Sequence, residues 1–205
     1  MTGPRRPTRE ASQLIDVGSV RLRRDSDLAR ARDIIDHAPS DDAEVQVHRA
    51  TMLDLLDRCP DLADRDCRPG HLTGSALVVD DSSEHTLVMF HRKLQRWLQP
   101  GGHADGDTNL VAVGLREASE ETGIDGLCVD PVPLDLDVHR VAPPAEDAHL
   151  HLDVRFLVVA PPGAITRGND ESEALRWVTE LELAGLGADP GLLRLARVGF
   201  KRRRA

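Results

Sequence analysis

The sequence has no tyrosine and few other large aromatic residues, with three phenylalanines and two tryptophans in 205 residues. A core must therefore be built from Leu, Val, Ala and Ile, and few side chains remain to stack on bases. The formal net charge is −9. Because nucleic-acid binding by counterion release requires a basic surface, this charge argues against a general nucleic-acid binder.

Cysteine is also scarce, and its spacing argues against a disulfide framework or a zinc knuckle. Cys59, Cys67 and Cys128 form no CxxC pair, which is typical of free thiols in a reducing compartment. No apolar run approaches the ~20 residues of a membrane span, and the N-terminus lacks a secretory apolar segment. We therefore expect a cytoplasmic protein with no membrane partner.

The length suits one domain with a helical extension. We expect residues 1–68 to form a flexible or loosely docked lead-in followed by a helical hairpin, with helices that end before Pro39 and Pro60. The hairpin packs either on the following domain or on another subunit, which leaves a homodimer open. The candidate N-caps are Asp25 or Ser26 for the first helix and Ser40 or Asp41 for the second.

The pattern changes period at residue 69, where the second predicted domain begins and runs to residue 205. Short apolar strands are expected at residues 72–79 and 86–90, joined by a hairpin turn at Asp80. Strands before and after a central helix, with helices late in the chain, predict an α+β fold arranged as an α/β/α sandwich. The remaining predicted elements are strands at 128–141, 149–160 and 174–178, and helices at 108–122, near 181 and at 190–203.

The most informative segment is an acidic helix with glycines before and after it. Glu117, Glu120 and Glu121 are related as i, i+3 and i+4, so they project from one face. Their repulsion favours a compensating cation, and hard carboxylate oxygens select Mg²⁺ or Mn²⁺. The alternative is a solvated acidic face, which is the usual role of a glutamate run. The flanks favour the metal site, since Gly102 permits close backbone approach and Gly123 can end the helix in the left-handed conformation.

This segment resembles the signature box of the Nudix hydrolases. The outer glutamate of that pattern falls on Thr108 here, and we expect Asp107 or Thr108 to cap the helix. The resemblance extends more loosely from about residue 69 to the C-terminus. The matching residues are Gly102, Arg116, Glu117, Ala118, Glu120, Glu121, Gly123 and Ile124.

The resemblance implies an α/β/α sandwich that hydrolyses nucleoside diphosphates linked to another group, with Mg²⁺ or Mn²⁺. The box glutamates named above would hold the metal and act in catalysis, aided by the Gly102 carbonyl. Arg116 would orient them, and His103 lies close enough to the glycines to reach a phosphate. The carboxylate that takes the proton from water comes either from the box or from a later loop, for which Glu171 and Glu173 are candidates.

Histidines form a second constellation. His149, His151 and Asp153 alternate on one strand face, where with His139 they either line the substrate cleft or bind a second metal. The alternative is that they are partly buried polar groups with ordinary hydrogen bonds. Trp97 and Phe156 either stack on a base or pack in the core.

Two other functions remain open. A ligand-sensing regulator could keep the fold without turnover, and the Thr108 departure is its best support. An isoprenyl-diphosphate isomerase shares the fold but would need a catalytic cysteine, and neither Cys67 nor Cys128 matches that pattern. The substrate would be a small nucleotide-type molecule, selected by loops outside the box.

Overall fold

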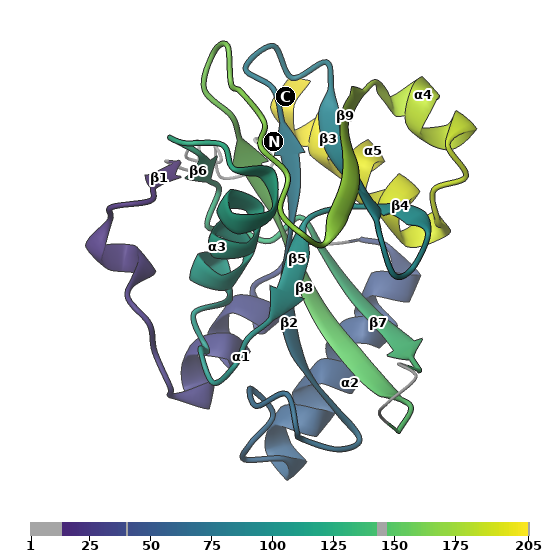
Figure 1. Ribbon diagram of the computed structural model, residues 1–205. Helices are drawn as coiled ribbons and strands as arrows, with labels where there is room; N and C mark the ends of the chain where they lie inside the picture. Colours follow the sequence, from purple (N-terminus) through teal and green to yellow (C-terminus); the bar gives the residue numbers. More distant parts are fainter. Residues whose placement is uncertain (1–13, 40, 143–146, 205) are drawn as a thin grey trace, which may run out of the picture.

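The computed structural model describes residues 14–39, 41–142 and 147–204. Most of the predicted lead-in, residues 1–13, and the candidate cap Ser40 lie outside this part of the chain. No helix within these ranges has both the length and the apolar composition that crossing a membrane requires. Five α-helices and a nine-stranded mixed sheet account for most of the described chain (Figure 1).

The centre of the sheet is β2 (Gly70–Val79), which runs parallel to β8 (His149–Val159). On its other edge β2 pairs with β3 (Thr86–His91) and β5 (Gly101–His103), both antiparallel. The predicted hairpin between β2 and β3 is therefore confirmed. The remaining strands are β1 (Ile15–Asp16) beside β6 (Cys128–Val129), β6 and β7 (Asp135–Val141) beside β8, and β4 (Arg96–Leu98) and β9 (Ser172–Val178) beside β3.

Helices cover both faces of this sheet. Leu72, Ala76 and Val78 of β2 belong to the core shared with α1, α2 and α3, whereas Leu77 and Val79 belong to the core shared with α4 and α5. Because successive side chains of a strand point to opposite faces, the alternation separates two helical layers. The α+β sandwich is confirmed. The helices are α1 (Leu28–Asp36), α2 (Ala43–Arg58), α3 (Leu110–Thr122), α4 (Glu180–Gly185) and α5 (Pro190–Arg204).

The two N-terminal helices form where predicted, with different caps. Asp27 caps α1 and Asp42 caps α2, each accepting a 2.9 Å hydrogen bond from the backbone N–H two residues on. The predicted caps Asp25 or Ser26 and Asp41 are wrong, because each helix begins one residue later than the nearest of them. The hairpin packs on this chain's own sheet, with α2 lying along β7.

The segment before α1 braces the loop that leads into α3. Asn109 Nδ2 donates to the carbonyl oxygens of Arg21 and Arg23, at 2.9 and 3.0 Å. Thr108 N donates to Asp25 O at 2.8 Å. The end of the expected lead-in is therefore tied to the loop that precedes the acidic helix.

The predicted strand over residues 128–141 is divided in two. β6 ends at Val129 and β7 begins at Asp135, since Pro131 and Pro133 offer no N–H groups to continue a ladder. β4 and β5 were not predicted. Each has three residues, which is too short for alternation to be recognised.

A buried charge network holds α5 over the sheet. Arg155 of β8 pairs with Asp153, Asp137 and Asp135 at 2.7, 2.9 and 3.3 Å. Arg194 of α5 adds pairs to Asp135 at 3.1 Å and Asp137 at 2.8 Å. Removing one member would leave an uncompensated buried charge, so the network fixes where α5 can lie.

We predict that Gly123→Ala destabilises the fold more than Gly163→Ala does. Both glycines have positive φ, 63° and 70°, so alanine is strained at either position. A Cβ at Gly123 would also collide with the backbone oxygen of Arg167, whereas nothing lies within 4 Å of a Cβ at Gly163. Urea denaturation should show a loss of about 1 kcal/mol for Gly163→Ala and at least about 2 kcal/mol for Gly123→Ala. Equal losses would contradict the close approach.

Candidate active site

The end of α3 lies against β5, and the β5 glycines allow this approach. Glu121 Oε2 accepts a 2.9 Å hydrogen bond from Gly101 N. Glu117 lies over Gly102, where a Cβ would collide with the Glu117 carboxylate. Two carboxylates one helical turn apart therefore meet the same short stretch of backbone.

Arg116 links one of these carboxylates to β5. Its Nη2 donates to Glu117 Oε1 at 2.9 Å and to the carbonyl oxygen of His103 at 3.0 Å. Its Nε also donates to Glu117 Oε1, at 3.3 Å. The guanidinium thus orients the Glu117 carboxylate and anchors it to the strand.

The site concentrates negative charge in a buried place. Glu121 is 5% exposed, and burial raises the pKa of its carboxyl to about 8 despite the Gly101 hydrogen bond, with repulsion from Glu117, Glu171 and Glu120 adding to the rise. Burial also raises the pKa of Glu117, although Arg116 opposes this rise. Such a set favours a divalent cation, which would stabilise the charged forms.

The two later glutamates, Glu171 and Glu173, lie in different surroundings. The charge of Glu171 acts on Glu121, so this residue belongs to the electrostatic environment of the box. Glu173 instead accepts a hydrogen bond from Gln95 Nε2 at 3.1 Å. Among the box glutamates, Glu120 is the exposed one.

The start of the box helix differs from expectation. Asn109 precedes the first helical residue, and no side chain caps the helix there, so the prediction of Asp107 or Thr108 as the N-cap is wrong. Asp107 Oδ1 accepts from Asn109 N at 3.0 Å and from Asp25 N at 3.1 Å. Thr108 is fully buried. Both Asp107 and Asn109 therefore bond to the segment before α1, and neither side chain caps α3.

A histidine cluster lies on the other face of β5 and β2. His71 of β2 joins His149 and His151 of β8, with ring centroids 4.8 Å and 4.9 Å from that of His71. His103 of β5 and His139 of β7 lie beside the same group, 5.2 Å and 5.5 Å from His151. The sequence analysis missed His71, because only the parallel pairing of β2 with β8 sets it opposite His151.

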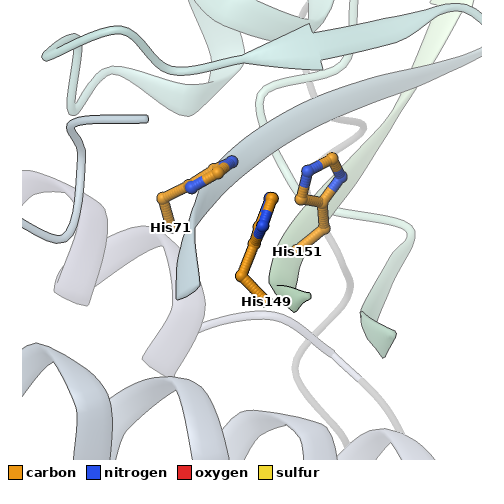
Figure 2. Close-up of side chains that lie close together, drawn as sticks. All are labelled: His71, His149 and His151. Carbon is orange, nitrogen blue, oxygen red and sulfur yellow. The ribbon is translucent and has the colours of Figure 1, made fainter. Parts of the chain in front are cut away.

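The three closest histidines lie near the beginnings of two parallel strands (Figure 2). Burial, with repulsion from neighbouring imidazoles, lowers the pKa of His71 to about 4 and that of His151 to about 3, so both are neutral at pH 7. Asp153 does not join them. Its carboxylate accepts hydrogen bonds from Thr73, Ser75 and Arg155 instead.

The two aromatic candidates pack in the protein. Phe156 is fully buried in the core on the α3 side. Trp97 packs on the core shared with α5, with its ring 5.3 Å from that of Phe90. Core packing, the alternative to base stacking, therefore accounts for the positions of both rings.

Comparison with known proteins gives a family and a fold. A family model for the NUDIX domain matches residues 70–197. A crystal structure of a C. elegans Ap4A hydrolase binary complex is similar at a TM-score of 0.52 and 13% identity, covering 62% of this chain and 93% of that one. A second structure of C. elegans Ap4A hydrolase gives 0.50 and 14%, covering 65% and 98%. No curated protein sequence matched the chain.

We predict that metal-free protein loses stability as the pH rises from about 7 to about 8, above the ordinary histidine pKa of 6.5, where the lowered pKa values of His71 and His151 no longer make stability rise with pH. The folded-state pKa of Glu121, about 8, lies above its ordinary value of 4.5, so the folded state binds the proton more tightly. This contribution is complete below the unfolded pKa and is lost as the pH rises through the folded one, with a slope of up to about 1.4 kcal/mol per pH unit. Denaturation in chelator at a series of pH values measures it.

Glu121→Gln should remove most of this slope, because the amide does not titrate. The matched control is Glu120→Gln on the exposed part of the same helix, which should leave the slope in place. A wild-type slope that survives Glu121→Gln would show that another group causes it.

Proposed function

The chain belongs to the NUDIX family, and we propose that it is a divalent-metal-dependent pyrophosphohydrolase acting on a nucleoside diphosphate derivative. The observation that carries this proposal is the pair of the buried Glu121 and the half-buried Glu117 against the β5 backbone. Placing two like charges this close together and away from water costs stability, so a helix with only a structural role would gain nothing from the pair.

The donor set fits a hard divalent cation. Glu117, Glu120 and Glu121 would hold Mg²⁺ or Mn²⁺ through carboxylate oxygens, with the Gly102 carbonyl as a further donor. When bound, the ion supplies charge neutralisation for the phosphoryl oxygens and activation of the attacking water. The raised pKa of Glu121 supports this assignment, since burial leaves its negative charge poorly compensated by the protein.

The other proposed site residues position the ligands and the substrate. Arg116 holds the Glu117 carboxylate in place by bonding it and the His103 carbonyl together. Gly102 forms the proposed substrate side in β5, where its missing side chain leaves room beside the Glu117 carboxylate. The His103 ring lies on the other face of β5, against His71 and His151, so the expectation that it reaches the phosphate at this site is not proposed further. Pre-positioned charges of this kind cost no reorganisation when charge develops on a phosphoryl group.

The isomerase alternative is not favoured. It would need a reactive thiolate, but burial raises the pKa of Cys67 to about 12 and that of Cys128 to about 11. Both thiols also donate hydrogen bonds to aspartates, Cys67 to Asp61 and Cys128 to Asp16. Protonated thiols of this kind are poor nucleophiles.

The proposed substrate is a small nucleotide in which a pyrophosphate joins a nucleoside to a second group. The net charge of −9 disfavours long nucleic acids. We place the activity in the cytoplasm, which the free thiols of Cys59, Cys67 and Cys128 support.

We predict that Glu121→Gln lowers kcat with Mg²⁺ by at least about a hundredfold on any nucleotide that the wild type cleaves, because a lost metal ligand costs at least as much as a lost outer-shell partner. The assay is product release from a panel of nucleotide sugars, dinucleoside polyphosphates, nucleoside triphosphates and capped RNA ends. A variant that turns over at the wild-type rate would reject the site. A wild type that binds a nucleotide without cleaving it would favour the regulator.

A matched pair tests the later loop. Glu171→Gln should lower kcat by about tenfold because Glu171, whose charge acts on Glu121, is the later-loop carboxylate proposed to take the proton from water. Glu173→Gln should stay within about twofold of wild type because that side chain bonds Gln95. An equal loss in both variants would contradict the distinction.

A further inference from the structure

The histidine cluster contains a buried side chain whose polar atoms are unused. His71 is 1% exposed, and within the described part of the chain neither of its ring nitrogens has a hydrogen-bond partner. Buried polar atoms are normally paired, because leaving them unpaired sacrifices the hydrogen bonds that water would make. A ligand that accepts a nitrogen lone pair would remove this cost.

The neighbouring His149 is already oriented as metal-binding histidines are. Its Nδ1 lies 2.8 Å from the carbonyl oxygen of Asp147. A carbonyl can only accept, so in the neutral ring the tautomer with the proton on Nδ1 and the lone pair on Nε2 is favoured. A hydrogen bond of this kind to the far nitrogen fixes the tautomer and ring direction of metal-ligating histidines.

His151 completes a set of three on two adjacent strands. One nitrogen from each of His71, His149 and His151 lies within 4.8 Å of the others. Nitrogens around a tetrahedral ion at about 2.1 Å lie about 3.4 Å apart, so small ring rotations would bring them together. The pairing of His71 with His151 across β2 and β8 holds two of the three at a fixed separation.

We propose that His71, His149 and His151 form a binding site for a divalent transition-metal ion of the Zn²⁺ class, separate from the carboxylate site on α3. Neutral imidazoles select Zn²⁺, Co²⁺, Ni²⁺ or Cu²⁺ over Mg²⁺, which prefers oxygen. Three protein ligands also leave a fourth position for water or another side chain.

The proposed histidine site lies on the opposite face of the sheet from the box glutamates. His71 and His151 lie on the face of β2 and β8 that also carries Thr73 and Asp153, whereas the α3 glutamates approach β5 from the side of Gly102. His103 and His139 flank the three ligands at ring distances of 5.0 Å from His71 and 5.5 Å from His151. Loss of one metal site should therefore leave the other intact.

The test is a Zn²⁺ titration of chelator-stripped full-length protein against a chromophoric competitor, with Co²⁺ absorption as a second readout. Wild type should bind about one tight Zn²⁺ per chain and give the intense visible bands of tetrahedral Co²⁺. His149→Ala and His151→Gln should each weaken Zn²⁺ binding by at least about tenfold. His37→Ala, at the exposed end of α1, is the matched control and should bind as wild type does.

Glu121→Gln separates the two sites, because it should lower nucleotide turnover by at least about a hundredfold and leave the tight Zn²⁺ unchanged. The proposal is overturned if wild type holds no tight Zn²⁺, if the histidine variants bind as tightly as wild type, or if Glu121→Gln removes the ion. Circular dichroism checks the fold of each variant. Should a histidine variant unfold, the wild-type Co²⁺ spectrum decides, since weak octahedral bands would contradict a three-histidine site.

Discussion

The site depends on one interaction, the burial of the Glu121 carboxylate against the Gly101 N–H beside the Glu117 carboxylate. A single backbone hydrogen bond and the nearby Arg116 are too little to compensate this charge, and the raised pKa of Glu121 is the consequence. A hard cation is the physical solution that keeps both glutamates ionised. The proposed chemistry follows from this deficit of positive charge.

The surrounding fold holds the pair in place. α3 approaches β5 because Gly102 has no side chain, and it ends at Gly123 in the left-handed conformation. On the other side, the segment before α1 bonds the loop that enters α3, chiefly through Asn109. The N-terminal extension therefore contributes to the geometry of the site, even though the match to the family begins at residue 70.

The parts predictable from the sequence are those with local causes. The acidic helix, its left-handed end at Gly123 and the β2 and β3 hairpin follow from periodicity and turn residues, and the structure has them. The cap expected at the start of α3 did not form, because the Asp107 carboxylate accepts from Asp25 N, which is 82 residues away in the sequence, as well as from Asn109 N. His71 could not be identified as a member of the histidine cluster, because its neighbours lie on a strand about 80 residues later in the sequence. Parallel pairing of two such strands leaves no local pattern from which it could be predicted.

Whether Glu117 and Glu121 bind a divalent ion can be measured by titrating Mn²⁺ into metal-free protein and following the free ion by electron paramagnetic resonance. The account predicts that wild type takes up at least about one Mn²⁺ per chain at sub-millimolar concentrations, and that a Glu117→Gln, Glu121→Gln double variant, folded by circular dichroism, loses that uptake. Equal uptake by the two proteins would contradict it, because Glu117 and Glu121 would then not be what binds the ion.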